Sequence, residues 1–229
     1  MITQVVPNKR GGSVKHSFRD VQAKVNALQG APLETGGPLL GPQKPGKKGM
    51  KTLVLDLDET LVHSSFKPHP GRQSDLQVPL LIDKVECKVH VLVRPGTLQF
   101  VETLAKNFEV VIFTASLAKY AEPLVAMLDK NRSWCSQILF RDHCTYNEQE
   151  ETFVKDLSRL GRDLKDVIII DNSPSSYCQH KENALACRSW FNDVRDRELY
   201  EFIPILKKLA KVEDVRPYLS KIGSEATHK

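Results

Sequence analysis

Three short apolar runs, each ending in a polar residue, constrain the fold of this 229-residue chain more than any other feature. They are Thr52–Asp56, Val110–Thr114 and Val167–Asp171. The runs are rich in Val and Ile and do not alternate with polar residues. This pattern is typical of strands that are buried on both faces of a parallel sheet.

Helical patterns lie between and after these runs. Leu98, Val101, Leu104 and Ala105 are spaced to share one helical face, and apolar residues recur in the same way between Leu199 and Leu209. Strands that alternate with amphipathic helices predict an α/β fold with a doubly wound, mostly parallel sheet.

One segment departs from this pattern. Residues 78–93 alternate between apolar and polar side chains, with Leu80 and Ile82 before Asp83 and Lys84, and Val89 after them. This alternation predicts a small antiparallel β insert after the first strand, with its turn at Asp83-Lys84.

Charge and composition divide the chain into three parts. Residues 1–50 are rich in Gly, Pro and Lys and predict a flexible basic tail, residues 51–219 a single domain, and residues 220–229 a flexible C-terminal tail. Residues 1–51 carry a net charge of +7 and the remainder −2, so the predicted domain has no basic excess for nucleic acid. No run approaches the ~18 apolar residues of a membrane span. Five cysteines without a CxxC pair indicate reduced thiols rather than disulfides or a zinc site.

Polar residues at the predicted strand ends suggest chemistry, because ligands of open α/β sheets bind outside the carboxyl ends of the strands. Asp56 and Asp58 follow the first run, and Asp171-Asn172 ends the third. Paired carboxylates repel each other unless a cation lies between them, and oxygen ligands suit Mg²⁺. Lys155 precedes the third run and can supply a fixed positive charge.

Four segments, DLDETLVHSSF, FTASLAKYA, VKDLSRLGRDL and DNSPSSY, resemble the four motifs of the haloacid-dehalogenase superfamily. More narrowly, they resemble the small C-terminal-domain phosphatases, whose relatives dephosphorylate the heptad-repeat tail of RNA polymerase II. The resemblance extends from about Lys51 to Leu219. It implies a Mg²⁺-dependent protein serine/threonine phosphatase that works through an aspartyl-phosphate.

The resemblance also implies a role for each motif residue. Asp56 is the nucleophile, and Asp58 is the general acid for the leaving hydroxyl and then the base that activates water. Thr114 and Lys155 hold the phosphoryl oxygens. The implied Mg²⁺ ligands are the Asp56 side chain, the Asp58 backbone carbonyl, Asn172 and, through water, Asp171. Two displacements require a nucleophile and a separate acid–base group, which fits the presence of two aspartates.

In the same family the insert forms an apolar pocket for a proline-containing phosphopeptide. The matching positions are Phe66, Leu80, Ile82, Val89 and Leu117, with Tyr120 and Arg141 nearby. Leu80, Ile82 and Val89 could equally form a small core. Two departures leave the substrate preference open: Val93 stands where relatives often have lysine, and the segment Tyr146–Thr152 is longer and more acidic than usual.

Three functions compete. The first is a phosphatase acting on phosphoserine in a proline-rich protein segment, expected to be monomeric and to lie in the nucleus, or also in the cytoplasm. The second is a phosphatase for a small metabolite, which the absence of a large cap segment disfavours. The third is a phosphopeptide-binding module without activity, which the full set of motif residues disfavours. A cysteine-based phosphatase signature, Cys135 to Arg141, lacks the glycines of a phosphate loop and instead predicts a strand.

Overall fold

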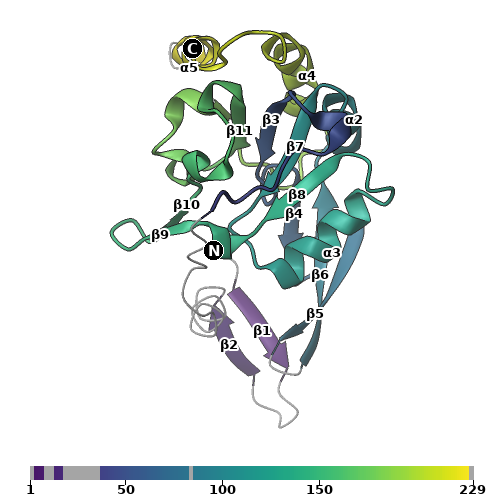
Figure 1. The fold of residues 1–229 in the computed structure, drawn as a ribbon. Coiled ribbons are helices and arrows are strands. Elements are labelled where there is room, and N and C mark those ends of the chain that lie inside the picture. The colour runs from purple at the N-terminus through teal and green to yellow at the C-terminus, as the bar shows by residue number, and fades with distance from the viewer. Residues whose placement is uncertain (1–2, 8–12, 18–36, 83–84, 227–229) are drawn as a thin grey trace.

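The computed structural model of the protein describes residues 3–7, 13–17, 37–82 and 85–226. Strands β1 (Thr3–Pro7) and β2 (Ser13–Ser17) pair as an antiparallel hairpin near the N-terminus (Figure 1). The flexibility predicted for residues 1–50 falls largely on residues outside this description.

A five-stranded parallel sheet forms the centre of the domain, in the order β12-β11-β3-β7-β8 (Figure 1). Its strands are β3 (Lys51–Leu55), β7 (Phe108–Phe113), β8 (Cys135–Leu139), β11 (Val167–Asp171) and β12 (Ala184–Ala186). Strands β3, β7 and β11 coincide with the three apolar runs, and all their residues are buried. The prediction of a parallel sheet covered on both faces is confirmed.

The register of the three central strands brings their carboxyl ends to one edge. Leu55 of β3 lies opposite Ile112 of β7 and Ile170 of β11. Asp56 extends the pairing, because its N–H donates to the carbonyl of Ile170 at 3.0 Å. The polar residues that follow these strands therefore lie at the same edge of the sheet.

The two faces of the sheet are covered differently. One face packs against helices α2 (Thr97–Leu104), α3 (Ala118–Leu128) and α4 (Glu198–Leu209), and α2 contacts α4. The other face packs against Leu40 and short 3₁₀ turns that contribute Leu157, Leu160 and Tyr177. Helix α5 (Arg216–Ala226) contacts β12 at the edge of the sheet. The prediction for α2 is wrong at Leu98, which is 47% exposed, whereas Phe100 is buried in the core.

The antiparallel insert has three strands rather than two. They are β4 (Val62–Ser65), β5 (Leu76–Ile82) and β6 (Val85–Val93), in the order β4-β6-β5. The predicted β5–β6 hairpin is confirmed, although its turn, Asp83-Lys84, lies outside the described residues. Pro79 is tolerated because β5 is an edge strand. Strand β4, which the sequence pattern did not reveal, joins the insert directly to the turn after β3.

Ordered packing continues on both sides of residues 51–219. Leu40 is 1% exposed, and the N–H of Leu39 donates to the carbonyl of Arg159 at 2.8 Å. Gly161 has a φ of +72°, and a Cβ there would lie 2.4 Å from the side chain of Pro38. At the other end α5 runs to Ala226, past Leu219. Within the described ranges, no helix has the length and apolar character needed to cross a membrane.

Candidate active site

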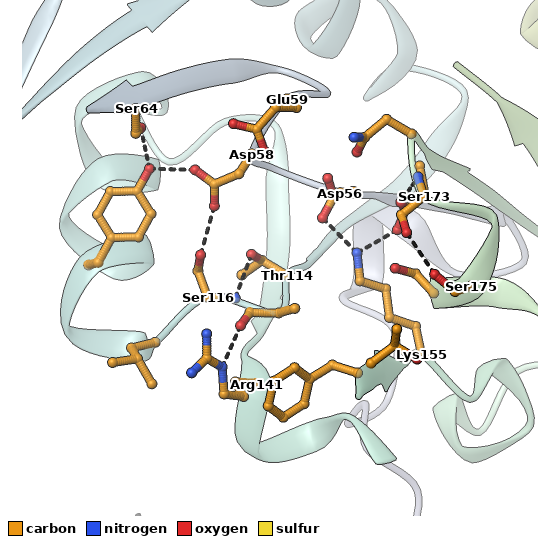
Figure 2. Close-up of a pocket in the computed structure, with 18 of the residues that line it drawn as sticks. Asp56, Asp58, Glu59, Ser64, Thr114, Ser116, Arg141, Lys155, Ser173 and Ser175 are labelled. Atoms are coloured by element: carbon orange, nitrogen blue, oxygen red, sulfur yellow. Dashed lines mark hydrogen bonds and ion pairs between the residues drawn. The ribbon is translucent and has the colours of Figure 1, made fainter. Parts of the chain in front are cut away.

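The carboxyl-end edge of the sheet opens into a cavity of about 570 Å³. Its walls come from the turn after β3, the insert, the segment between β7 and α3, strand β10 (Thr152–Val154) and the turn after β11. Figure 2 shows the polar side chains Asp56, Asp58, Thr114 and Lys155 gathered at its centre. These are the four residues that the sequence analysis assigned to catalysis.

Asp56 is buried at the base of this cavity. Its Oδ1 accepts a hydrogen bond from Lys155 Nζ at 2.6 Å, and its Oδ2 accepts one from Thr60 Oγ1 at 3.0 Å. Burial raises the pKa of Asp56 to about 7, with a further contribution from the charge of Asp171, while Lys155 opposes the shift. Desolvation favours the protonated form of Asp56, and the adjacent Lys155 ammonium is the feature of the site that favours the ionised, nucleophilic form.

Lys155 joins two strand ends. Its ammonium lies 2.6 Å from Asp56 Oδ1 and 2.6 Å from Asp171 Oδ2, and the side chain is 1% exposed (Figure 2). Its backbone N–H donates to the carbonyl of Ser176 at 2.7 Å, which fixes the segment after β10 (Thr152–Val154). Burial opposes the charge, but the two carboxylates outweigh it and raise the pKa of Lys155. The lysine is thus a permanent cation at the site.

Asp58 reaches the cavity because the chain turns sharply after β3. Glu59 has a φ of +59°, and its N–H donates to the carbonyl of Val62 at 2.7 Å. The carboxylate of Asp58 accepts hydrogen bonds from Ser116 Oγ and Tyr120 OH, both at 2.7 Å. Burial and the neighbouring Glu59 raise the pKa of Asp58, and the two hydroxyls oppose this shift. A raised pKa favours a carboxyl group that can carry a proton.

Thr114 follows β7 and faces the same cavity. Its side chain is buried, and its Oγ1 accepts the N–H of Ser116 at 3.0 Å. Its own N–H donates to the carbonyl of Leu139 at 2.9 Å, which continues the pairing of β7 with β8. The hydroxyl is therefore held in the cavity wall near the two aspartates.

The predicted metal ligands come together at the ends of β3 and β11. Thr60 Oγ1 contacts both Asp56 Oδ2 and Asn172 Oδ1, the latter at 3.1 Å, so these two oxygens flank one hydroxyl. Among the described residues, no cluster of three or more His, Cys, Asp or Glu side chains is arranged to hold a metal. The donor set is instead two carboxylates, Asp56 and Asp171, with an amide. Two aspartates contact the single ammonium of Lys155, and this all-oxygen, net-negative arrangement fits a hard cation such as Mg²⁺.

Most of the residues predicted to bind substrate line the cavity. They are Phe66, Leu80, Val89, Leu117, Tyr120 and Arg141. Leu80 and Val89 also belong to the hydrophobic core of the domain, so the packing role considered for them is observed and the substrate-binding role stays a prediction. Ile82 ends β5, and its side chain lies outside the described residues. Val93 pairs with Val62 in the insert and is not among the lining residues.

One wall of the cavity was not predicted from the sequence. It is formed by the hairpin of β9 (Thr145–Asn147) and β10. Glu151 and Phe153 line the cavity, and the Arg141 guanidinium lies 4.7 Å from the centre of the Phe153 ring. Arg141 Nε also donates to the carbonyl of Ala115 at 2.6 Å. The unusual length and acidity of residues 146–152 were the only sequence signal for this wall.

The cysteine-based alternative finds no support in the geometry. Cys135 begins strand β8, as the sequence predicted, and is not among the residues that line the cavity. Burial raises the pKa of its thiol to about 12, the opposite of what a thiolate nucleophile needs.

The central sheet is parallel, with an Asp-x-Asp turn after its middle strand, a hydroxyl residue after the neighbouring strand β7 and a lysine beside an acid–amide pair. Together these features define a haloacid-dehalogenase-like fold. The chain belongs to the NLI interacting factor-like phosphatase family, whose sequence model matches residues 51–216.

Named relatives agree with this membership. The chain is 53% identical over 179 residues to a probable C-terminal domain small phosphatase of Dictyostelium discoideum, covering 78% of this chain and 57% of that protein. It is 48% identical over 163 residues to the human carboxy-terminal domain RNA polymerase II polypeptide A small phosphatase 1, covering 71% and 60%. The chain therefore spans less than two thirds of the length of these relatives.

A solved structure shows the same fold. Fcp1, described as an essential RNA polymerase II CTD phosphatase, superimposes with a TM-score of 0.52 at 20% identity, covering 79% of this chain and 54% of that one.

Proposed function

We propose that the chain is a Mg²⁺-dependent protein serine/threonine phosphatase that works through an aspartyl-phosphate on Asp56. The observation that carries the proposal is the pairing of two aspartates with different surroundings in one cavity. Asp56 is buried against the Lys155 ammonium, whereas Asp58 is held by neutral hydroxyls. Separate environments of this kind suit a nucleophile and an acid–base group.

In the first displacement, an Asp56 carboxylate oxygen attacks the phosphorus of the substrate and the bond from phosphorus to the serine oxygen breaks. Asp58 donates its proton to that leaving oxygen, so serine departs as a neutral hydroxyl. Lys155 and Thr114 hold the phosphoryl oxygens, and the lysine charge offsets the repulsion between the carboxylate and the phosphate.

In the second displacement, water attacks the phosphorus of the aspartyl-phosphate. Asp58, now ionised, removes a proton from that water, and the bond from phosphorus to the Asp56 oxygen breaks. Inorganic phosphate leaves, and both aspartates return to their starting states.

Asp56, Asn172 and the backbone carbonyl of Asp58, with Asp171 acting through water, would hold Mg²⁺. When bound, the ion supplies positive charge that Lys155 alone does not provide. Asp171 contributes through the ammonium of Lys155 as well, since its carboxylate helps to keep that lysine charged and in place.

The apolar wall supports a protein substrate. Phe66, Leu80 and Leu117 lie in the same cavity as the catalytic aspartates and offer an apolar surface next to the phosphate. We propose phosphoserine or phosphothreonine in a proline-rich segment, such as the carboxy-terminal domain of RNA polymerase II that the name of the human relative mentions. We also propose that the enzyme is a monomer and that it lies in the nucleus, where such a substrate occurs, or also in the cytoplasm.

Rates on three substrates, each with and without Mg²⁺, test this proposal. A Mg²⁺-dependent rate on 4-nitrophenyl phosphate separates an enzyme from a phosphopeptide-binding module. A preference for a proline-containing phosphoserine peptide over small sugar and nucleotide phosphates separates a protein phosphatase from a metabolite phosphatase. Absence of turnover on all three would contradict the proposal.

Removal of divalent metal is expected to abolish turnover of 4-nitrophenyl phosphate. Excess Mg²⁺ should restore the rate and Ca²⁺ should not, because a larger ion with looser coordination misplaces the phosphoryl group. Asn172→Ala should raise the Mg²⁺ concentration for half-maximal rate by about 10-fold or more. Asn107→Ala, at an exposed position away from the cavity, is the matched control. Full activity in excess chelator would contradict the metal assignment.

Phe66→Ala is expected to lower kcat/KM on a proline-containing phosphopeptide by roughly 5- to 100-fold, since loss of a buried aromatic contact costs about 1–3 kcal/mol. Turnover of 4-nitrophenyl phosphate should change much less, because that small ester makes fewer contacts with the apolar wall than a peptide does. Leu81→Ala serves as the control, since Leu81 is 62% exposed in the same insert. Equal losses on both substrates, or a fall in melting temperature that accounts for them, would assign Phe66 to the core instead.

A further inference from the structure

Hydroxyl groups from two separate segments hold the carboxylate of Asp58. Ser116 Oγ, from the segment between β7 and α3, donates to Oδ2, and Tyr120 OH, from the first turn of α3, donates to Oδ1. Both distances are 2.7 Å, and hydrogen bonds to a carboxylate are stronger than those between neutral groups. With a donor on each oxygen, the carboxyl group has one preferred orientation (Figure 2).

A residue of the antiparallel insert also holds the Tyr120 hydroxyl in place by a hydrogen bond. Ser64 Oγ, in β4, forms a hydrogen bond with Tyr120 OH. The backbone N–H of Tyr120 donates to the carbonyl of Leu117 at 3.0 Å, which closes the first turn of α3. A continuous series of hydrogen bonds thus runs from the insert through Tyr120 and Asp58 to Ser116.

The same tyrosine also forms part of the apolar wall. Tyr120 is half-buried, packs against the hydrophobic core and lines the cavity together with Phe66, Leu80 and Leu117. One side chain therefore presents its ring to the surface proposed for the peptide and its hydroxyl to the acid–base carboxylate.

We infer that Tyr120 and Ser116 are positioning residues that orient Asp58 for proton transfer, and that Tyr120 links the peptide-binding wall to this step. The inference rests on the proposed function, because it requires Asp58 to be the acid–base group. It adds a second role to Tyr120, which the sequence analysis assigned to substrate binding alone.

Dependence on the leaving group distinguishes positioning from packing. The serine oxygen is a poor leaving group that needs a proton from Asp58, whereas 4-nitrophenolate leaves readily without one. Misorientation of the acid should therefore slow transfer from phosphoserine and largely spare transfer from the aryl ester. General acid–base catalysis contributes roughly 10²- to 10⁴-fold, which sets the upper limit of the effect.

Tyr120→Phe provides the test, because it keeps the ring in the wall and removes only the hydroxyl. We expect kcat/KM on the phosphoserine peptide to fall by about 10- to 100-fold, and that on 4-nitrophenyl phosphate by less than about 3-fold. Ser116→Ala should give the same selectivity. Peptide affinity, measured as Kd in an Asp56→Asn background that cannot turn over, should be unchanged by Tyr120→Phe. Tyr218→Phe, at a 53% exposed tyrosine of α5, controls for loss of a tyrosine hydroxyl elsewhere.

A double-mutant cycle with Asp58→Asn completes the experiment. Because both residues act through one proton transfer, Tyr120→Phe should add little to the loss already caused by Asp58→Asn on the phosphopeptide. Equal losses on the two substrates, a weakened Kd that accounts for them, or full additivity in the cycle would overturn the inference. Full activity of Asp58→Asn on the phosphopeptide would instead contradict the proposed function, so the two failures are distinguishable.

Discussion

Asp56→Asn is expected to reduce turnover of every phosphate ester by at least about 10⁴-fold, because in the proposed mechanism it removes the atom that forms the covalent bond to phosphorus. The effect should be the same on a phosphopeptide and on 4-nitrophenyl phosphate, since a good leaving group cannot replace a missing nucleophile. Steady-state rates at saturating Mg²⁺ measure it. Substantial residual activity would show that the two-aspartate mechanism is wrong.

Trapping experiments separate the two aspartates. The unmodified chain should form an adduct with beryllium fluoride in the presence of Mg²⁺, and Asp56→Asn should form none. Asp58→Asn should still accept phosphate from 4-nitrophenyl phosphate and accumulate the aspartyl-phosphate, because it lacks the base for the second displacement. Mass spectrometry of acid-quenched samples reports the aspartyl-phosphate, and fluorine NMR of the folded protein reports the beryllium fluoride adduct.

Folding of Asp56→Asn is the control for this result. Burial raises the pKa of Asp56, which means that the ionised carboxylate is disfavoured in the folded state. Asparagine has nearly the same shape and removes this cost, while Lys155 loses one of its two buried partners and keeps Asp171, so the melting temperature should change little. A low melting temperature would mean that lost activity reflects lost structure.

Much of the fold could be predicted because its strongest signals are local. Buried parallel strands are continuous apolar runs, and β3, β7 and β11 each match one. The edge that carries Asp56, Thr114 and Asp171 follows from parallel strands that end together. These residues could therefore be placed in one site from the sequence alone.

What could not be predicted depends on contacts between distant segments. Strand β4 has only four residues and is defined by its pairing with β6, not by its own pattern. Leu98 has helical spacing but is 47% exposed, whereas Phe100 is buried in the core that α2 forms with other elements, α4 among them. The hydrogen bond between Tyr120 and Asp58 joins residues 62 positions apart, and neither side chain reveals the other.

The packing of the segment before residue 51 also depends on contacts with distant residues, and it could not be predicted either. Its Gly and Pro content indicates a linker, yet Leu40 fills a site formed by Leu157, Leu160 and Tyr177. One apolar side chain in a Pro-rich segment carries no periodicity, so packing of this kind is visible only once the receiving surface is known.

Lys155→Met is expected to cause the second largest effect, on both activity and stability. Methionine has similar length but no charge, and it leaves Asp56 and Asp171 buried without their shared cation. Removal of one partner from a buried ion pair destabilises proteins by roughly 3–5 kcal/mol, and the free energy of unfolding from urea titration should fall by about this amount. Loss of transition-state charge stabilisation should lower kcat by about 10²- to 10³-fold.

Two further variants decide whether charge is the cause of these losses. Lys165→Met changes a half-exposed lysine whose nearest carboxylate, Asp163, lies 3.9 Å away, and it should alter stability by well under about 1 kcal/mol. Asp171→Asn added to Lys155→Met removes one of the two carboxylates left without a cation, so it should recover part of the lost stability. It should not recover activity, because no cation then faces the phosphate except the metal. Recovery of activity in the double variant would show that Lys155 serves only to neutralise Asp171. Failure to recover stability would show that the lysine side chain is required for packing rather than for its charge.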